Sequence, residues 1–174
     1  KYKVIDFKNS PLDDESVDVV IANHVLFYAE DVHKVVEEIK RVLKPGGKLV
    51  CTTYGSNHMK EISTLVQEFD DRIVLAAEHL YEIFGKDNGA DILGEHFPKV
   101  KWKEYEDKLV VTDSEALADY IISCHGNQNS YIVDRYKEFK QFIDGKMKNG
   151  FEITKEAGMF VAKKKKDNSA SDDE

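Results

Sequence analysis

The stretch 17–53 constrains the fold more than any other part of the chain. Residues 17–22 are nearly all apolar and β-branched, which is typical of a strand that a parallel sheet covers on both faces. Residues 30–44 place apolar side chains at helical spacing, with acids in the first turn and bases in the last. Pro45-Gly46-Gly47 ends this helix, and residues 48–53 predict the next strand. The order indicates a βαβ unit, so we expect two parallel strands joined by a right-handed crossover.

Strand and helix patterns continue on both sides of this unit. Residues 2–5 predict a short strand, and residues 6–15 have the polar, Pro-containing composition of a loop. Apolar spacing then predicts helical structure in 58–84, as one helix or two, and helices in 114–124 and 131–147. It also predicts a strand within 100–111 and a final strand or hairpin in 151–162. The chain therefore alternates strands and helices before it ends in two helices and a last strand.

Size and charge narrow the possible partners. The 174 residues suit one domain or slightly more, and 41% hydrophobic residues provide a core. The net charge is −8, and the tail 163–174 sums to zero because it holds four lysines and four acids. An acidic body binds phosphate backbones poorly, so no nucleic acid partner is expected. Neutral or cationic small molecules remain compatible with this charge.

Localisation signals are sparse. No apolar run approaches the ~20 residues that a membrane span needs, so no membrane partner is expected. No signal-peptide pattern follows Lys1. Cys51 and Cys124 form no CxxC pair and no disulfide framework, which indicates a reducing, cytoplasmic setting.

Several common site motifs are absent. The sequence has neither GxGxxG nor GxxxxGK[ST], no HExxH, no Cys/His quartet at zinc spacing and no GxSxG. These absences argue against the common NTPases, zinc hydrolases and α/β-hydrolases. The sequence therefore predicts no metal site. No functional role is needed for His33, His79 and His96, and Trp102 is expected in the core.

Three motifs in a fixed order carry a family resemblance. Asp6-Phe7-Lys8-Asn9-Ser10-Pro11-Leu12 comes first, followed by Asp18-Val19-Val20-Ile21-Ala22-Asn23-His24-Val25-Leu26 and by Arg41-Val42-Leu43-Lys44-Pro45-Gly46-Gly47. Together they resemble the class I S-adenosylmethionine-dependent methyltransferases, of the broad ubiquinone/menaquinone small-molecule type. The resemblance implies transfer of a methyl group from S-adenosylmethionine to an O, N or C nucleophile. The Pro-Gly-Gly run is expected to turn the chain tightly and not to bind cofactor.

The resemblance also implies an incomplete domain. In that family a glycine-rich loop follows the first strand, and an acid that holds the ribose ends the second, whereas residues 2–5 resemble the third strand. Two βα units, roughly 60 residues on βαβ sizing, would then precede Lys1. The implied fold class is α/β, a three-layer Rossmann-like methyltransferase sheet without its first two βα units and with an antiparallel C-terminal strand. The domain would span 1–162, with a helical insertion or lid at about 113–149 and a disordered charged tail at 163–174.

The resemblance assigns cofactor-binding residues at two places. Asp6 would accept a hydrogen bond from the adenine amino group, and Phe7 would lie beside the adenine ring. Asn23 and His24 end a strand at the carboxyl edge of the sheet and would line the methionine portion. The alternatives are a plain loop acid at Asp6 and polar residues that cap a strand end at Asn23 and His24.

Residues farther along would face the acceptor substrate. Phe27 and Tyr28 would wall the transfer site, where aromatic rings attract a sulfonium, although plain core packing explains them equally well. Tyr54 and His58 follow the next strand and would touch the acceptor. His58 is a weak candidate for a general base, and a solvated loop histidine is the alternative; the catalytic residue is otherwise unknown. A further polar cluster, on the expected lid, is His125, Asn127 and Gln128.

Two other classes of function stay open. The chain could be a non-catalytic methyltransferase-like fragment that acts as a binding or dimerisation module, because exposed strand edges recruit other strands. A homodimer is then a possible partner in addition to a small-molecule acceptor. Another doubly wound α/β protein, such as a reductase, ranks last because its nucleotide fingerprint is absent.

Overall fold

The structure is a computed structural model that describes residues 2–75, 79–147 and 150–166. The chain divides into two compact units, which we describe separately. Unit 1 comprises 1–55, 80–104 and 157–174, and unit 2 comprises 56–79 and 105–156. Within the described ranges, no helix has the length and apolar character that a membrane crossing requires.

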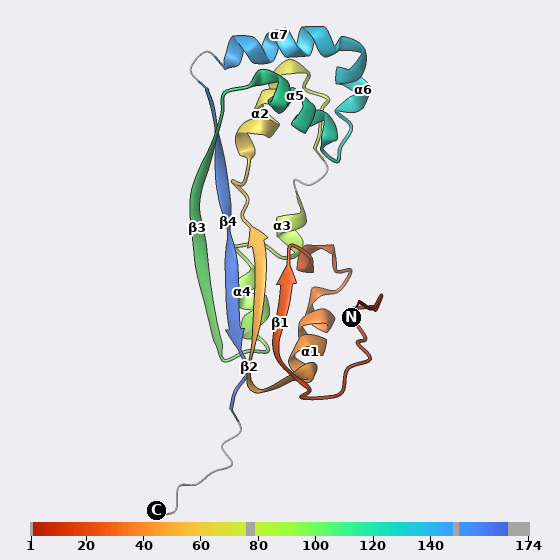
Figure 1. The fold of residues 1–174 in the computed structure, drawn as a ribbon, viewed down its shortest axis with the longest axis vertical. Coiled ribbons are helices and arrows are strands. Elements are labelled where there is room, and N and C mark those ends of the chain that lie inside the picture. Colours follow the sequence, from red (N-terminus) through yellow and green to blue (C-terminus); the bar gives the residue numbers. More distant parts are fainter. Residues whose placement is uncertain (1, 76–78, 148–149, 167–174) are drawn as a thin grey trace, which may run out of the picture. The chain divides into compact units, whose positions relative to one another are not determined.

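One mixed sheet of four strands has the order β1-β2-β4-β3 (Figure 1). The strands are β1 (Val17–Asn23), β2 (Leu43–Tyr54), β3 (Lys99–Val111) and β4 (Phe151–Lys163). β1 pairs with β2 in parallel, and β2 pairs with β4 antiparallel. The parallel pair and the antiparallel C-terminal strand confirm the predictions from the sequence.

The four longest described helices fall where apolar periodicity predicts them, whereas the helical segment predicted at 58–84 is interrupted after Phe69 and the short helix at 89–94 was not predicted. Unit 1 contains η1 (Leu26–Tyr28), α1 (Val32–Val42), α3 (Leu80–Ile83) and α4 (Gly89–Gly94). Unit 2 contains α2 (Lys60–Phe69), α5 (Ser114–Ser123), α6 (Asn129–Ile132), η3 (Val133–Arg135) and α7 (Tyr136–Lys146). Asp31 fixes the start of α1, because its carboxylate accepts the backbone N–H of Lys34 at 3.2 Å.

The core of unit 1 lies on one face of the sheet. Leu49 and Cys51 of β2 face it, and their partners across the antiparallel ladder, Ala162 and Phe160, are equally buried. The same buried cluster takes in Val35, Val36 and Ile39 of α1 and Phe84, Leu93 and Phe97 of the segment 80–97. Helix α1, which precedes β2 in the sequence, and the segment 80–97, which follows it, therefore pack on the same face of the sheet.

The opposite face corrects one prediction. Val19 and Ile21 of β1 point to it and are 50% and 67% exposed, so β1 is not covered on both faces. The physical reason is that α1 and the segment 80–97 share the face that Leu49 presents.

The strand predicted at 2–5 is wrong. Residues 2–6 form no regular element, and the side chains of Tyr2 and Val4 are fully exposed. An extended segment becomes a strand only through a partner, and the described sheet ends at β1. Residues 6–15 form the expected loop of turns and bends.

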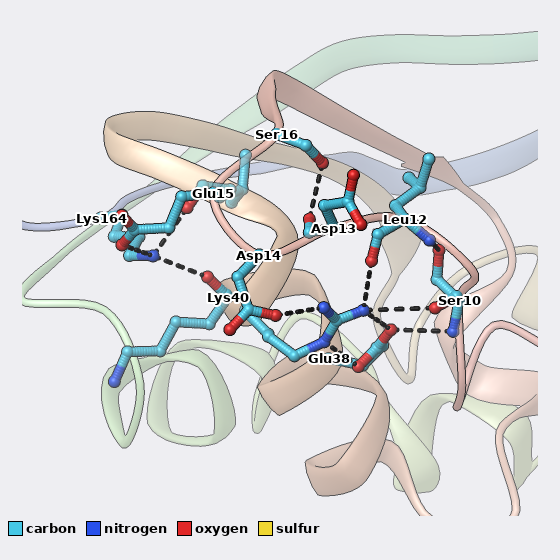
Figure 2. Close-up of polar contacts among 11 residues, drawn as sticks. Ser10, Leu12, Asp13, Asp14, Glu15, Ser16, Glu38, Lys40 and Lys164 are labelled. Atoms are coloured by element: carbon cyan, nitrogen blue, oxygen red, sulfur yellow. Dashed lines mark hydrogen bonds and ion pairs between the residues drawn. The ribbon is translucent and has the colours of Figure 1, made fainter.

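Arg41, the first residue of the Arg41–Gly47 motif, binds the loop before β1 to α1. Figure 2 labels its partners Ser10, Leu12, Asp14 and Glu38. Its Nη2 donates to the carbonyl oxygens of Leu12 at 2.8 Å and Ser10 at 3.2 Å. Its guanidinium also pairs with Glu38 and Asp14, and Glu38 Oε1 accepts the N–H of Ser10 at 2.8 Å. The planar guanidinium group of arginine carries several N–H donors, so it can bind all of these acceptors at once.

The two glycines of the motif are required by the backbone. Gly46 has φ +77°, a left-handed conformation that side chains disfavour. A Cβ on Gly47 would lie 2.8 Å from the carbonyl oxygen of Lys44 and 3.0 Å from that of Asp18. The predicted turn from helix to strand is corrected, because α1 ends at Val42 and the run lies inside β2, where the register with β1 shifts.

The first residues of the charged tail are ordered, which corrects part of the disorder prediction. Lys163 ends β4, and Lys164 Nζ donates to the carbonyl oxygen of Lys40 in α1 at 3.1 Å (Figure 2). It also donates to the carbonyl oxygen of Leu43, the residue that follows α1, at 2.6 Å. The same ammonium pairs with Glu15 at 2.9 Å. A cation at a helix C-terminus satisfies its last carbonyls. The predicted disorder of 167–174 lies outside the described residues.

Unit 2 has its own core, formed by α2, α5 and α7. Its buried side chains include Leu65, Val66, Ile121, Phe139 and Ile143. The predicted insertion at 113–149 falls inside this unit, which also holds α2. Its action as a lid stays a prediction.

Candidate functional site

The candidate site lies at the carboxyl ends of β1 and β2 in unit 1. These strands are parallel, so Asn23 at the end of β1 and Tyr54 at the end of β2 lie at the same edge of the sheet. Asn23 is exposed and pairs in register with Thr52. Ligands of open α/β sheets bind at this edge.

His24 leaves β1 in a strained conformation. Its φ is +48°, which few residues other than glycine adopt. Its backbone N–H donates to Thr52 Oγ1 at 3.0 Å and to the Thr52 carbonyl oxygen at 3.3 Å, and these bonds hold the turn. Strain of this kind costs on the order of 1–3 kcal/mol and concentrates at functional sites.

Four rings form what we call the aromatic group: Phe27, Tyr28, Tyr54 and Tyr81. Phe27 is buried at its centre, with ring centroids 4.8 Å from Tyr28 and 5.4 Å from Tyr54, both edge to face. Tyr81 of α3 extends the group, 6.4 Å from Tyr54. The His24 ring lies 6.1 Å from Phe27. The structure thus brings three of the four predicted acceptor-facing residues together beside His24.

The aromatic group offers neutral π faces. Burial raises the pKa of the Tyr54 phenol, and the neighbouring phenols of Tyr28 and Tyr81 raise it further. Tyr54 therefore stays protonated at neutral pH and does not act as a base there. Tyr28 is 65% exposed, so solvent or a ligand can reach its ring. The π faces of such neutral phenol rings attract cations electrostatically.

Asp6 and Phe7 lie in the loop before β1. The Asp6 carboxylate accepts the N–H of Lys8 at 2.9 Å, and its carbonyl oxygen accepts the N–H of Asn9 at 3.1 Å. The exposed carboxylate retains acceptor capacity, which fits an amino group of a ligand. Phe7 packs against the unit 1 core.

His58 and the polar cluster at 125–128 belong to unit 2. His58 is half-buried, and its role stays a prediction. Asn127 accepts the N–H of Val74 at 2.7 Å through Oδ1, and Gln128 donates to the Ile121 carbonyl oxygen at 3.1 Å. These amides therefore satisfy backbone groups of their own unit.

Two residues of the site have no clear signal in the sequence. Tyr81 lies in α3, a helix of four residues that is too short for a periodic pattern. Thr52 fixes His24 through its side chain, although strand threonines are common. The hydrogen bond from His24 at the end of β1 to Thr52 in β2 depends on the pairing register of the two strands.

Comparison with known proteins identifies the N-terminal part. The family model described as "Methyltransferase domain" matches residues 1–51. Residues 1–51 are therefore similar to part of a methyltransferase domain, in agreement with the resemblance seen in the sequence. The matched residues include Asp6, Phe7, Asn23 and His24, and also Phe27 and Tyr28 of the aromatic group.

Curated relatives with different names match part of this chain. A malonyl-[acyl-carrier protein] O-methyltransferase of Nitrosospira multiformis is 31% identical over 71 residues, which are 41% of this chain and 23% of the relative. Its namesake in Coxiella burnetii is 36% identical over 62 residues, 36% of this chain and 22% of the relative. A sterol 4-C-methyltransferase of Caenorhabditis elegans is 42% identical over 50 residues, 29% of this chain and 15% of the relative. The matches thus span less than a quarter of these relatives' length.

Solved structures extend the fold comparison to most of the chain. A Bacillus halodurans protein described as a candidate methyltransferase covers 95% of this chain and 78% of its own, with 16% identity and a TM-score of 0.50. The MccD protein covers 95% of this chain and 68% of its own, again with 16% identity and a TM-score of 0.50. At this identity the similarity shows the fold alone, and it confirms the predicted Rossmann-like class.

Proposed function

We propose that the chain forms part of a methyltransferase that binds S-adenosylmethionine at the carboxyl edge of β1 and β2. The observation that carries the proposal is the aromatic group beside the strained His24, at the edge where α/β sheets bind ligands. The family match of residues 1–51 supports it, because these residues include both strand-end and loop positions of the site.

S-adenosylmethionine supplies an activated methyl group, so the protein mainly has to align donor and acceptor and exclude water. In this proposal Asp6 accepts from the adenine amine, with Phe7 near the ring. Asn23 and His24 line the methionine portion. The exposed ring of Tyr28 and the half-buried ring of Tyr54 attract positive charge.

The relatives suggest a first acceptor, a malonyl group carried by a protein. A carboxylate acceptor is already an anion and needs no general base. Such an acceptor suits a wall in which burial keeps the Tyr54 phenol protonated. A small neutral or cationic acceptor is the competing class, and the sterol 4-C-methyltransferase among the relatives supports it.

Transfer of labelled methyl from S-adenosylmethionine tests the activity and the acceptor together. The panel contains a malonyl-loaded carrier protein, its acetyl-loaded counterpart as the matched control, and a set of small amines. Label on the malonyl carrier alone supports both proposals. Label only on an amine supports methyl transfer and overturns the malonyl acceptor. No label on any of these compounds, together with no binding of the donor, overturns the proposed activity.

A second candidate is a module that binds another chain, and the bare face of β1 favours it. Val19 and Ile21 are half or more exposed on one face of an edge strand. Sedimentation of the chain and of its Ile21→Lys variant measures the oligomeric state of each. A dimer that Ile21→Lys dissociates supports the module, and a monomer at all concentrations rejects a dimerisation role.

A further inference from the structure

We propose that His33, Glu95 and His96 of unit 1 bind a divalent transition metal, with Zn²⁺ as the best-fitting ion. One ligand atom from each residue lies within 4.8 Å of the others. His33 Nδ1 and Glu95 Oε2 are already 2.9 Å apart. Two imidazoles and one carboxylate form a donor set that zinc sites use.

The distances are close to those of a coordinated ion. Zinc bonds of about 2.1 Å to nitrogen and oxygen place tetrahedral ligand atoms roughly 3.4 Å from one another. The widest separation in the cluster therefore needs to shrink by about 1.4 Å, which rotation of exposed side chains supplies. The His33 and Glu95 side chains are 52% and 57% exposed, so an ion has an open path and water can fill the fourth position.

The backbone positions of the three ligands are well anchored. His33 lies in the first turn of α1, directly after the buried Val32, and the α1 core residues fix this helix. Glu95 and His96 follow α4 and lie between two fully buried side chains, Leu93 and Phe97. The N–H groups of His96 and Phe97 both donate to the Leu93 carbonyl oxygen, at 3.1 and 2.9 Å. Anchoring of this kind favours a defined site.

A bound ion would tie α1 to the end of α4, two segments that are distant in the sequence and share one core. The site lies outside the aromatic group. Binding to the folded state alone would raise the stability of unit 1 with metal concentration. Metals that imidazole suits, such as Zn²⁺, should bind, whereas Mg²⁺ should not.

Competition of the untagged chain with a chromophoric chelator for Zn²⁺ tests the proposal. We expect one equivalent of Zn²⁺ to bind in the presence of excess Mg²⁺. His33→Gln and His96→Gln should each weaken binding by about tenfold or more, since even outer-shell changes cost about 10–100-fold. His125→Gln, a change at an exposed histidine of unit 2, is the matched control and should leave the affinity unchanged.

Independent readouts separate a lost ligand from a lost fold. Circular dichroism and the melting temperature without metal should be the same for each variant and for the wild type. Zn²⁺ should raise the melting temperature of the wild type and of His125→Gln only. Glu95→Gln, which keeps the side-chain size, serves if a histidine variant misfolds. Absence of one-equivalent binding, or equal affinity in His33→Gln, His96→Gln and His125→Gln, would overturn the site.

Discussion

Arg41 Nη2 donates to the carbonyl oxygen of Leu12 at 2.8 Å and so ties α1 to the loop that precedes β1. The same loop begins with Asp6 and Phe7, the proposed adenine-binding residues. The arginine of the Arg41–Gly47 motif therefore orders a neighbour of the cofactor site without belonging to it.

Arg41→Lys should loosen this loop. A lysine ammonium cannot reproduce the fork that reaches Leu12, Ser10 and Glu38 together. We expect faster proteolytic cleavage within 10–16 and a lower melting temperature. Lys34→Ala, which removes an exposed cation of the same helix, is the control and should change neither. Equal cleavage rates in the two variants would contradict the role given to Arg41.

Gly47→Ala should lower the free energy of unfolding by about 1–3 kcal/mol, the usual cost of overpacking. The added Cβ would meet backbone oxygens of Lys44 and Asp18, which cannot swing away. Gly94→Ala is the matched control, because a Cβ there meets nothing within 4 Å. It should be neutral or stabilising by about 0.5–1 kcal/mol. Urea unfolding of both variants gives the comparison.

Cys51 should make the protein less stable at alkaline pH. Burial raises the pKa of its thiol to about 12, above the ordinary value of 9.0 that the unfolded chain has. Because the pKa is raised, the contribution of the buried neutral thiol to the free energy of unfolding is complete below pH 9. This contribution is lost as the pH rises from about 9 to 12. At about pH 10.5 the loss is ~2 kcal/mol.

Urea unfolding at pH 8 and about pH 10.5 checks this for the wild type and Cys51→Ala. The variant starts less stable because of its cavity, and it should lose less stability between the two pH values. Native Cys51 should also resist thiol reagents that reach Cys124, which is only partly buried. An identical pH dependence in the variant would refute the assignment.

Asp70 should support unit 2 down to low pH. Arg72 and Arg135 contact its carboxylate at 2.6 and 3.0 Å, and these hydrogen bonds hold the pKa of Asp70 well below its usual range. A depressed pKa contributes stability above the unfolded value near 3.8, and the contribution disappears as the pH falls. Asp70→Asn should therefore flatten the decline in melting temperature from pH 5 to pH 2. Asp71→Asn, an exposed neighbour, should not.

Tyr28→Ala should weaken binding of S-adenosylmethionine without destabilising the fold. The ring is largely exposed, so its removal should change the free energy of unfolding by within about 0.5 kcal/mol. An exposed cation–π contact is worth about 0.5–1 kcal/mol, which corresponds to a roughly two- to fivefold loss of affinity. Tyr105→Ala, at an exposed ring of unit 2, is the control.

Local sequence patterns predicted most of the helices and strands, because the residues that define each of these elements are close together in the sequence. α1 combines an apolar face with the Asp31 cap, and β2 begins at Leu43, where the helix ends. The antiparallel pairing of β4 with β2 came from the family resemblance, since periodicity alone gives no pairing direction. Residues 2–5 have strand composition, but the pairing that makes a strand is not local.

The site was predictable only in part. The positions of Asn23 and Tyr54 follow from strand ends, and the family motif supplied Asp6. The contact of Tyr81 with Tyr54 depends on how α3 packs, which no short pattern encodes. His33 and Glu95 meet across 62 residues of sequence, so their spacing gives no signal.

Calorimetric titration of S-adenosylmethionine and of its demethylated product tests cofactor binding directly. The titration uses this chain and a version extended by the natural upstream sequence where the gene encodes one. We expect saturable one-to-one binding by at least one of them, weakened by Asp6→Asn and not by Asp13→Asn in the same loop. Absence of binding by both versions, or equal affinity in the two variants, would overturn the proposed cofactor site.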